Sequence, residues 1–407
     1  MSEILAGIRV LDLTQYLSGP QATLLLAGLG AEVIHVDNPA TGDLTADSPP
    51  YLGPEGLSLD RRTPEDLGVP YLKRARGKRA ITLNLKHADG AALFLALARR
   101  ADVVVENWTV GTAARLGVDY PACRAVKPDI VYCSISGYGQ TGPDSALRAY
   151  DTMAQAASGL MSLTGDPEGP PMKAGSPLAD TVAGTFAFAG ILAALLHRAR
   201  TGEGQHVDVS MVDCLLALVL DESPDVWGRL GLPTRPGNRL PRGSPFNVYP
   251  TVDGWIAVGT ASEAEWARLL DAMDRVELKA DPRFASRSWR LANNGRVDQV
   301  VETWTRSLRT AEAVARLRAA EVACAPVRGI DDLKACPQVA ARGMLEPLRH
   351  PTVGPWPDVV APGFPVKFGG ARVGYATPAP PTGRDNDAIW GGLLGLDVAA
   401  LRAKGVI

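Results

Sequence analysis

The stretch GIRVLDLTQYLSGPQATLLLAGLGAEVIHVD, Gly7–Asp37, decides the fold. It reads as an apolar strand (IRVLDL), a loop (TQYLSGP), a helix (QATLLLAGLG) and a second apolar strand (AEVIHVD). Two strands joined by a helix in this way are typical of a β-α-β unit, in which the strands run parallel.

The same alternation continues along the chain through RAITLNL, DGAALFLALARRA, DVVVEN, helical residues 110–126, PDIVYCSIS, a helix around 182–199, HVDVSM and a helix over Val212–Leu220. Apolar strands alternating with helices predict a parallel sheet covered on both faces, and so an α/β fold. The apolar stretch Val182–Leu196 is shorter than the roughly 18 residues of a bilayer span, and it predicts a buried core helix.

Changes in composition divide the chain into four parts. Residues 1–220 form a large α/β domain, although residues 40–70, rich in Pro, Gly and Asp, predict an irregular excursion. Residues 221–245 predict a linker, and residues 246–330 a small α+β domain that opens with the hairpin VYPTVDGWIAVG. Residues 331–407 predict few regular segments.

Composition excludes several classes of protein. The 407 residues carry 42 Lys+Arg against 44 Asp+Glu, so the net charge of −2 gives no reason to expect nucleic acid. The N-terminus lacks the pattern of a signal peptide. Five widely spread cysteines without a CxxC pair, and five histidines without metal spacing, indicate neither a zinc site nor a disulfide framework. We therefore expect a reduced, cytoplasmic protein with no membrane partner and no metal.

The motif GYGQTG, Gly137–Gly142, fits G-x-G-x-x-G and follows a predicted strand. A dinucleotide site also needs a helix directly after the glycines, whereas Pro143-Asp144 opens a polar segment here. The acidic residue expected on the ribose, Asp37, belongs to a different β-α-β unit. These mismatches disfavour nicotinamide binding.

Two other features admit both a structural and a functional interpretation. The basic run YLKRARGKR, residues 71–79, is either a solvated strand entrance or a phosphate site. Asp180 precedes an apolar helix in GSPLADTVAG, which suggests an N-cap. A cap and a nucleophile are compatible, because a helix N-terminus favours an ionised carboxylate and Gly184 could let a substrate approach closely.

Taken together, these segments resemble the class III coenzyme A transferase family. That group contains formyl-CoA transferases, carnitine and bile-acid CoA-transferases and 2-methylacyl-CoA racemases. The matching stretches cover nearly the whole chain in the family's order: GIRVLDLTQYLSGPQATLLLAGLGAEVIHVDNPATGD, RGKRAITLNLK, ADVVVENWTVGTAARLGVDY, PDIVYCSISGYGQTGP, GSPLADTVAG, HRARTGEGQHVDVSM, DGWIAVG, APVRGIDDL and ARGM.

The resemblance implies a large Rossmann-like domain, made of the N-terminal part and the returning C-terminal tail, with the small domain inserted between them. It also implies an interlocked dimer, either a homodimer or a heterodimer with a homologue. CoA and acyl-CoA are then substrates, and no cofactor is permanently bound. By the same resemblance CoA lies along Tyr16, Leu17 and Ser18, and its nucleotide and phosphates meet Arg76, Lys78, Arg79, Asn107 and Arg115.

Asp180 matches the family's catalytic aspartate. The resemblance implies that its carboxylate attacks the donor thioester to form a mixed anhydride, and that the released CoA thiolate then forms an aspartyl-CoA thioester. An acceptor carboxylate then reverses these steps. A covalent nucleophile of this kind divides one acyl transfer into easier steps. Backbone amides around Gly137 and Gly139 are suitable donors to the developing oxyanion.

Racemases of the family pair their aspartate with a histidine in G-H-D, where this chain has Ala149-Tyr150-Asp151. Tyrosine is a poor base near neutral pH, which favours CoA transfer over racemisation. Asp151 is either a second carboxylate that tunes Asp180 or holds the acceptor, or an ordinary helix-start residue. A 2-methylacyl-CoA racemase or epimerase and a non-catalytic CoA-binding subunit of a heteromeric CoA-transferase remain the alternatives.

Overall fold

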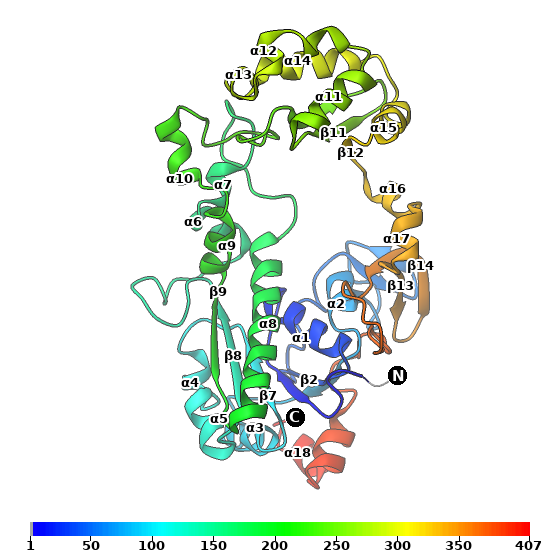
Figure 1. Cartoon of the computed structure of the whole chain (residues 1–407). Coiled ribbons are helices and arrows are strands. Elements are labelled where there is room, and N and C mark those ends of the chain that lie inside the picture. Colours follow the sequence, from blue (N-terminus) through cyan, green and yellow to red (C-terminus); the bar gives the residue numbers. More distant parts are fainter. Residues whose placement is uncertain (1–2) are drawn as a thin grey trace. The chain divides into compact units, whose positions relative to one another are not determined.

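The computed structural model describes residues 3–407 (Figure 1). Its contacts divide the chain into two compact units. The larger unit comprises Met1–Gly159, Ala174–Asp221 and Pro337–Ile407, and the smaller comprises Leu160–Lys173 and Glu222–Cys336.

A six-stranded parallel sheet forms the centre of the larger unit, and it confirms the predicted α/β fold. The strand order is β6-β2-β1-β7-β8-β9. Because the order of winding reverses between β1 and β7, the carboxyl ends of these two strands mark the switch point where α/β proteins bind ligands. The strands are β1 (Arg9–Asp12), β2 (Glu32–Asp37), β6 (Arg79–Thr82), β7 (Val103–Glu106), β8 (Val131–Ser136) and β9 (His206–Ser210).

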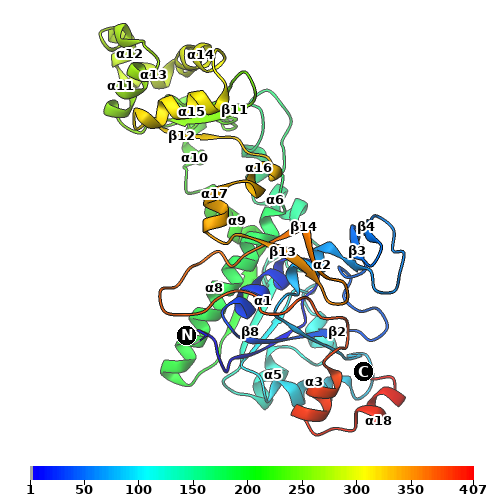
Figure 2. The same cartoon turned by 90° about the vertical axis from the view of Figure 1, so that its right-hand side faces the viewer.

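Helices cover both faces of this sheet, as the apolar strands predict (Figure 2). On one face, α1 (Ser18–Gly28) packs against α8 (Leu178–Thr201). On the other face lie α3 (Gly90–Ala98), α5 (Tyr120–Val126), η3 (Asp387–Leu393) and α18 (Val398–Ala403). The core on that face includes Phe94 and the fully buried Trp390, so residues far apart in sequence close it together.

Two stretches predicted to be largely irregular contain short strands, so that prediction is wrong in part. Residues 40–70 include the antiparallel strands β3 (Tyr51–Gly53), β4 (Gly56–Ser58) and β5 (Leu67–Gly68). The C-terminal part includes the hairpin of β13 (Leu345–His350) and β14 (Gly354–Pro362). Strands of two or three residues, and strands interrupted by proline, lack the periodicity by which strands are predicted.

The smaller unit contains its own antiparallel sheet, in the order β10-β11-β12. The hairpin of β10 (Phe246–Pro250) and β11 (Trp255–Gly259) lies where the sequence predicts it. Strand β12 (Ala323–Pro326) pairs with β11, and the sheet packs against α11 (Glu263–Ala272), α14 (Asn294–Thr305) and α15 (Thr310–Ala319) around a common core.

Short helices complete both units. In the larger unit they are α2 (Val69–Arg74), α4 (Thr112–Arg115), α6 (Asp151–Ala157), α9 (Met211–Val219) and α17 (Pro337–Ala341). In the smaller unit they are α7 (Leu160–Leu163), α10 (Pro224–Trp227), η1 (Gly228–Leu230), η2 (Val276–Lys279), α12 (Pro282–Ala285), α13 (Arg287–Ala292) and α16 (Ile330–Lys334).

Helix α8 is longer and more exposed than the buried core helix that its apolar sequence predicts. Within the described chain, only 39% of its most apolar 18-residue window is buried. Ala183, Ala187 and Ile191 lie in the core, whereas Phe186 and Leu196 are exposed. The helix is long and apolar enough to cross a membrane, but a single helix of this kind is weak evidence for a span, because core helices share these properties.

Candidate active site

A cavity of about 240 Å³ opens at the carboxyl ends of β7 and β8, beside the loop that follows β1. All of its lining residues belong to the larger unit. The cavity brings together six of the predicted site residues, which are Tyr16, Ser18, Asn107, Gly137, Tyr150 and Asp180. They come from five separate segments. Three of these segments follow β1, β7 and β8 and meet because parallel strands end at the same edge of the sheet, and the other two are the start of α6 and the first turn of α8.

The loop after β1 is fixed by hydrogen bonds from neighbouring segments. Asn107 accepts from the amide of Gln15 at 2.9 Å, and its Nδ2 donates to the carbonyl of Gln15 at 2.7 Å. The guanidinium of Arg74 donates to the carbonyl of Tyr16 at 2.9 Å. These bonds hold Tyr16 at a φ of 64°, in the left-handed region that a bulky residue seldom adopts. The ring of Tyr16 then meets Tyr150 edge to face, with centroids 6.1 Å apart.

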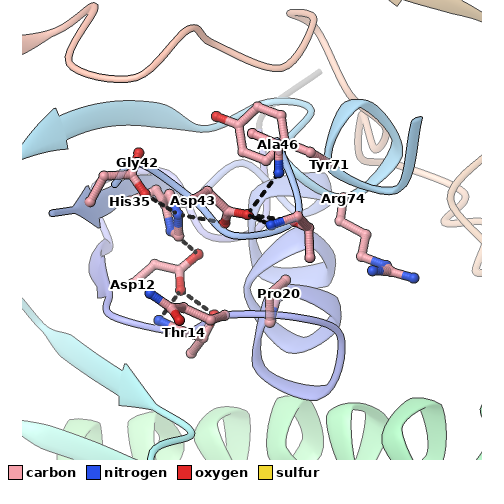
Figure 3. Close-up of polar contacts among 12 residues, drawn as sticks. Asp12, Thr14, Pro20, His35, Gly42, Asp43, Ala46, Tyr71 and Arg74 are labelled. Atoms are coloured by element: carbon pink, nitrogen blue, oxygen red, sulfur yellow. Dashed lines mark hydrogen bonds and ion pairs between the residues drawn. The ribbon is translucent and has the colours of Figure 1, made fainter. Parts of the chain in front are cut away.

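Beneath this loop, Asp12 anchors the start of the loop and of α1 (Figure 3). One carboxylate oxygen accepts from the amide of Thr14 at 3.0 Å. The other accepts from Lys78 Nζ at 2.9 Å and from the hydroxyl of Thr23 at 2.8 Å. Burial opposes ionisation of Asp12, but Lys78 and His35 prevail and hold its pKa far below the usual range.

His35 links Asp12 to two further carboxylates in the interior. Its Nδ1 lies 3.3 Å from Asp12, and its Nε2 lies 3.0 Å from Asp37 and 3.1 Å from Asp43. Burial lowers the pKa of His35, but Asp37 and Asp12 outweigh it and raise that pKa well above its usual value.

His35, Asp37 and Asp43 are close enough together to hold a metal ion. A ligating histidine must be deprotonated, however, and the three surrounding carboxylates favour the imidazolium. In the structure, His35 and the three carboxylates form a buried network of ion pairs. Histidine spacing alone did not predict this cluster, because Asp12 and Asp43 reach His35 from other segments of the chain.

Asp180 is the third residue of α8, whose N-cap position is Pro177. The helix N-terminus is instead capped by Asp151, which accepts from the amide of Ala179 at 2.7 Å. The other oxygen of Asp151 accepts from Gln155 Nε2, also at 2.7 Å. The N-cap interpretation of Asp180 is therefore wrong, and its carboxylate faces the cavity instead of closing its own helix.

The surroundings of Asp180 make its carboxylate unusually basic. Burial and the nearby Asp151 carboxylate raise its pKa to about 6, against the lowering effects of Arg74 and of hydrogen bonding to Ser18. At neutral pH most of the group is still ionised. A more basic carboxylate is the better nucleophile, provided that it stays deprotonated.

Three of the predicted basic residues do not line the cavity. Arg76 is 4% exposed, and its guanidinium bonds Glu346 at 3.0 Å and the carbonyl of Pro362 at 2.7 Å. Lys78 is 2% exposed and is paired with Asp12. Arg79 begins β6 and pairs with Glu32, which begins β2, so it lies at the opposite, amino-terminal edge of the sheet.

Leu17, Arg115 and Gly139, which were also predicted, do not line the cavity. Arg115 is exposed at the end of α4, where it bonds the hydroxyl of Thr112 at 2.8 Å. Leu17 is partly buried between two lining residues. The amide of Gly139 donates to Ser136 Oγ at 2.9 Å, so it is not free to bind an oxyanion.

Glycine at position 184 serves packing rather than substrate access. A Cβ built there would lie 2.5 Å from the carbonyl oxygen of Ser18, so the absence of a side chain lets α8 approach the start of α1. This close contact brings Asp180 to the loop after β1. The cavity also includes Gln15, Trp108 and Arg148, which no sequence pattern singled out.

A parallel sheet with a cavity at its switch point is the architecture of an α/β protein that binds a ligand at the carboxyl ends of its strands. Residues 5–386 match the family described as CoA-transferase family III. The chain belongs to this family, which confirms the resemblance seen in its sequence.

Named relatives agree with this assignment. The chain is 36% identical to the succinate–glutarate CoA-transferase of Agrobacterium fabrum over 383 residues, with 93% of each chain covered. It is 37% identical to the acetyl-CoA:oxalate CoA-transferase of Acetobacter aceti over 377 residues, with 92% of each covered. The fold matches the crystal structure of a CAIB/BAIF family protein from Brucella suis with a TM-score of 0.82 and 32% identity, covering 97% of this chain and 100% of that one. The family and its named members indicate CoA-transferase activity.

Proposed function

We propose that this protein moves CoA from an acyl-CoA donor to a free carboxylic acid through Asp180. The carboxylate attacks the donor carbonyl and expels the CoA thiolate to give a mixed anhydride. The thiolate then attacks the aspartyl carbonyl, which gives an enzyme-bound thioester and releases the donor's acid as a carboxylate. An acceptor carboxylate displaces CoA from that thioester, and the thiolate returns to the acceptor's acyl carbon. The observation that carries this proposal is that Asp180 lines the cavity and has a pKa raised to about 6.

Racemisation fits the same cavity less well. It requires a base and an acid on opposite faces of the substrate's α-carbon. Among residues 3–407, Asp180 and Arg148 are the only charged side chains that line the cavity, and neither tyrosine nor arginine is a good proton acceptor near neutral pH. A single carboxylate suits covalent transfer.

For CoA, we propose a path along Tyr16, Leu17 and Ser18, with Asn107 beside it and Arg115 near the phosphates. Tyr16, Ser18 and Asn107 line the cavity, and Arg115 is an exposed guanidinium close by in sequence. Lys78 would act indirectly, by bonding the carbonyl of Pro20 in the first turn of α1. Arg76 bonds Glu346 and Pro362 of the C-terminal hairpin, so we assign it no contact with CoA. CoA is then a substrate and no cofactor is retained.

For the acids, we propose that donor and acceptor are small dicarboxylic acids or their CoA esters. Relatives of this chain are named as succinate–glutarate, acetyl-CoA:oxalate and, in Haloarcula hispanica, succinyl-CoA:mesaconate CoA-transferases, and the acceptor acids in these names are dicarboxylic. We also propose a cytoplasmic homodimer. In the described chain, large apolar side chains of α8 and α9 are exposed, including Phe186, Leu196, Leu216 and Leu218, and no disulfide joins any of the five cysteines.

Intact-protein mass spectrometry tests the covalent step directly. Incubation with succinyl-CoA or acetyl-CoA should give an adduct of CoA mass on the wild type, and free dicarboxylic acids should discharge it. Asp180→Ala should give no adduct while still binding CoA. If wild-type protein binds CoA but forms no adduct with any donor, the proposal is wrong.

A further inference from the structure

Arg148 is the one cationic side chain that lines the cavity of Asp180, within the part of the chain that the structure describes. It is exposed, and it takes part in none of the ion pairs or side-chain hydrogen bonds found between the described residues. Twenty-odd other arginine and lysine side chains are paired, several of them even at the surface. A guanidinium without a protein partner, beside a catalytic carboxylate, remains available to an anionic ligand.

The backbone on both sides of Arg148 is held against the walls of the cavity. Ala149 packs onto Gly137 at the end of β8 so closely that a Cβ at Gly137 would lie 2.4 Å from the methyl group of Ala149. Asp151 bonds the amide of Ala179, the residue before Asp180, at 2.7 Å. Arg148 is three residues before Asp151, and Asp151 is bonded to the N-terminus of α8, which carries Asp180. This short connection limits the distance between Arg148 and the reacting carboxylate.

The charge of the cavity changes during the proposed reaction. In the free enzyme, Asp180 and Arg148 bring one negative and one positive charge to the lining of the cavity. When Asp180 carries CoA as a thioester, its negative charge is lost and Arg148 alone remains. The loaded enzyme then presents a net positive cavity to the next substrate, which is an anionic acid.

We propose that Arg148 binds the non-reacting carboxylate of a dicarboxylic acceptor and so selects dicarboxylic over monocarboxylic acids. This assignment rests on the proposed function of Asp180. One carboxylate of the acceptor attacks the aspartyl thioester carbon, the C–S bond breaks and the CoA thiolate leaves. The thiolate then attacks the acceptor's acyl carbon, and the C–O bond to Asp180 breaks to restore the aspartate. The second carboxylate keeps its charge throughout, and a guanidinium fork suits it through paired hydrogen bonds.

The test compares acids that differ in one charged group, with acetyl-CoA as a monocarboxylic donor. For Arg148→Gln, we expect kcat/KM for succinate to fall about 100-fold, and that for butyrate to change less than threefold. The KM for acetyl-CoA and the formation of the CoA adduct on Asp180 should stay at wild-type levels. Arg148→Lys should recover part of the succinate activity, because it restores the charge without the fork.

Arg99→Gln is the matched control, because Arg99 is also an exposed arginine of the larger unit but lies at the end of α3, outside the cavity. Arg99→Gln should leave kcat/KM for succinate and for butyrate, the KM for acetyl-CoA and the formation of the CoA adduct unchanged. An equal loss for succinate and butyrate, or no loss for either, overturns the assignment. A raised KM for acetyl-CoA also overturns it, since Arg148 would then serve CoA.

A binding measurement separates this proposal from that for Asp180. Asp180→Ala performs no covalent step, so calorimetry on this variant measures acid binding alone. Succinate should bind it more tightly than butyrate, and adding Arg148→Gln should remove that preference. If wild-type protein forms no adduct yet this preference is present and depends on Arg148, the covalent mechanism fails and the carboxylate site stands. If the adduct forms and the preference is absent, the assignment of Arg148 fails alone.

Discussion

Asp12 and Asp180 contact the same loop from two sides, yet their surroundings give them opposite properties. Asp12 is fully buried and bonds Lys78, Thr14 and Thr23, with His35 nearby, so its pKa lies far below the usual range. Asp180 faces an open cavity, and its pKa is raised to about 6.

Burial alone would raise the pKa of both groups. The difference comes from their partners. Two cations approach Asp12, whereas Asp180 has the carboxylate of Asp151 beside it as well as Arg74. A carboxylate that is paired with cations stabilises the fold. A carboxylate that has another carboxylate beside it is more basic and can act as a nucleophile.

Exchanging Asp180 for asparagine should produce the largest change in activity. Asp180→Asn keeps the size of the side chain but removes the nucleophile, so CoA transfer should fall at least about 10⁴-fold, with no CoA adduct in the mass spectrum. The melting temperature should change by only a few degrees, because Asp180 does not cap α8. Retained adduct formation in this variant would move the nucleophile to another residue.

Lys78→Met should have the largest effect on stability, because it leaves the Asp12 carboxylate buried without its closest cation. We expect a loss of about 3–5 kcal/mol in the free energy of unfolding, measured with urea at pH 7. Arg79→Met removes the neighbouring but exposed pair with Glu32 and should cost at most about 1 kcal/mol. Equal losses in the free energy of unfolding for the two variants would show that the buried pair stabilises the fold no more than the exposed pair does.

The stability that the Asp12–Lys78 ion pair contributes should decrease at acidic pH. The pKa of Asp12 is lower in the folded protein than its ordinary value of 3.8, so the pair stabilises the fold above that pH and is lost on acidification. Between pH 5 and pH 3, roughly the range in which free aspartate titrates, wild-type protein should therefore lose more stability than Lys78→Met.

The pH profile of CoA loading offers the finest test of the comparison. Because the ionised form of Asp180 reacts, kcat/KM for the donor should fall below a pH of about 6. Asp151→Asn removes a negative charge but retains an oxygen for the amide of Ala179, so the acidic limb should move to lower pH. Arg74→Gln removes a positive charge and should move that limb to higher pH. Shifts in the same direction would contradict this account of Asp180.

The sequence predicts the parallel sheet well, because its strands are short apolar runs with clear boundaries. Strands β1, β2, β7, β8 and β9 all lie within the segments expected to form them. The family resemblance located Tyr16, Asn107 and Asp180, and the structure brings these three residues to one cavity.

The roles of the basic residues could not be predicted as well. Lys73 to Arg79 form one run in the sequence, but the fold turns Lys78 inward and leaves Arg79 outside at the amino-terminal edge of the sheet. The network around His35 was also missed, since its partners come from β1 and from the excursion after β2. Local patterns do not record such distant pairings.

The face of the sheet covered by α3 and α5 has one further consequence, for protein synthesis. Trp390 and Val406 belong to the same core as Phe94 and Leu11, and the amide of Asn84 donates to the carbonyl of Val406 at 2.7 Å. The ribosome makes these covering residues long after the strands they protect. One apolar face of the nascent sheet therefore stays incomplete while residues 222–336 of the smaller unit are translated, and we expect chaperones to bind that face during this interval.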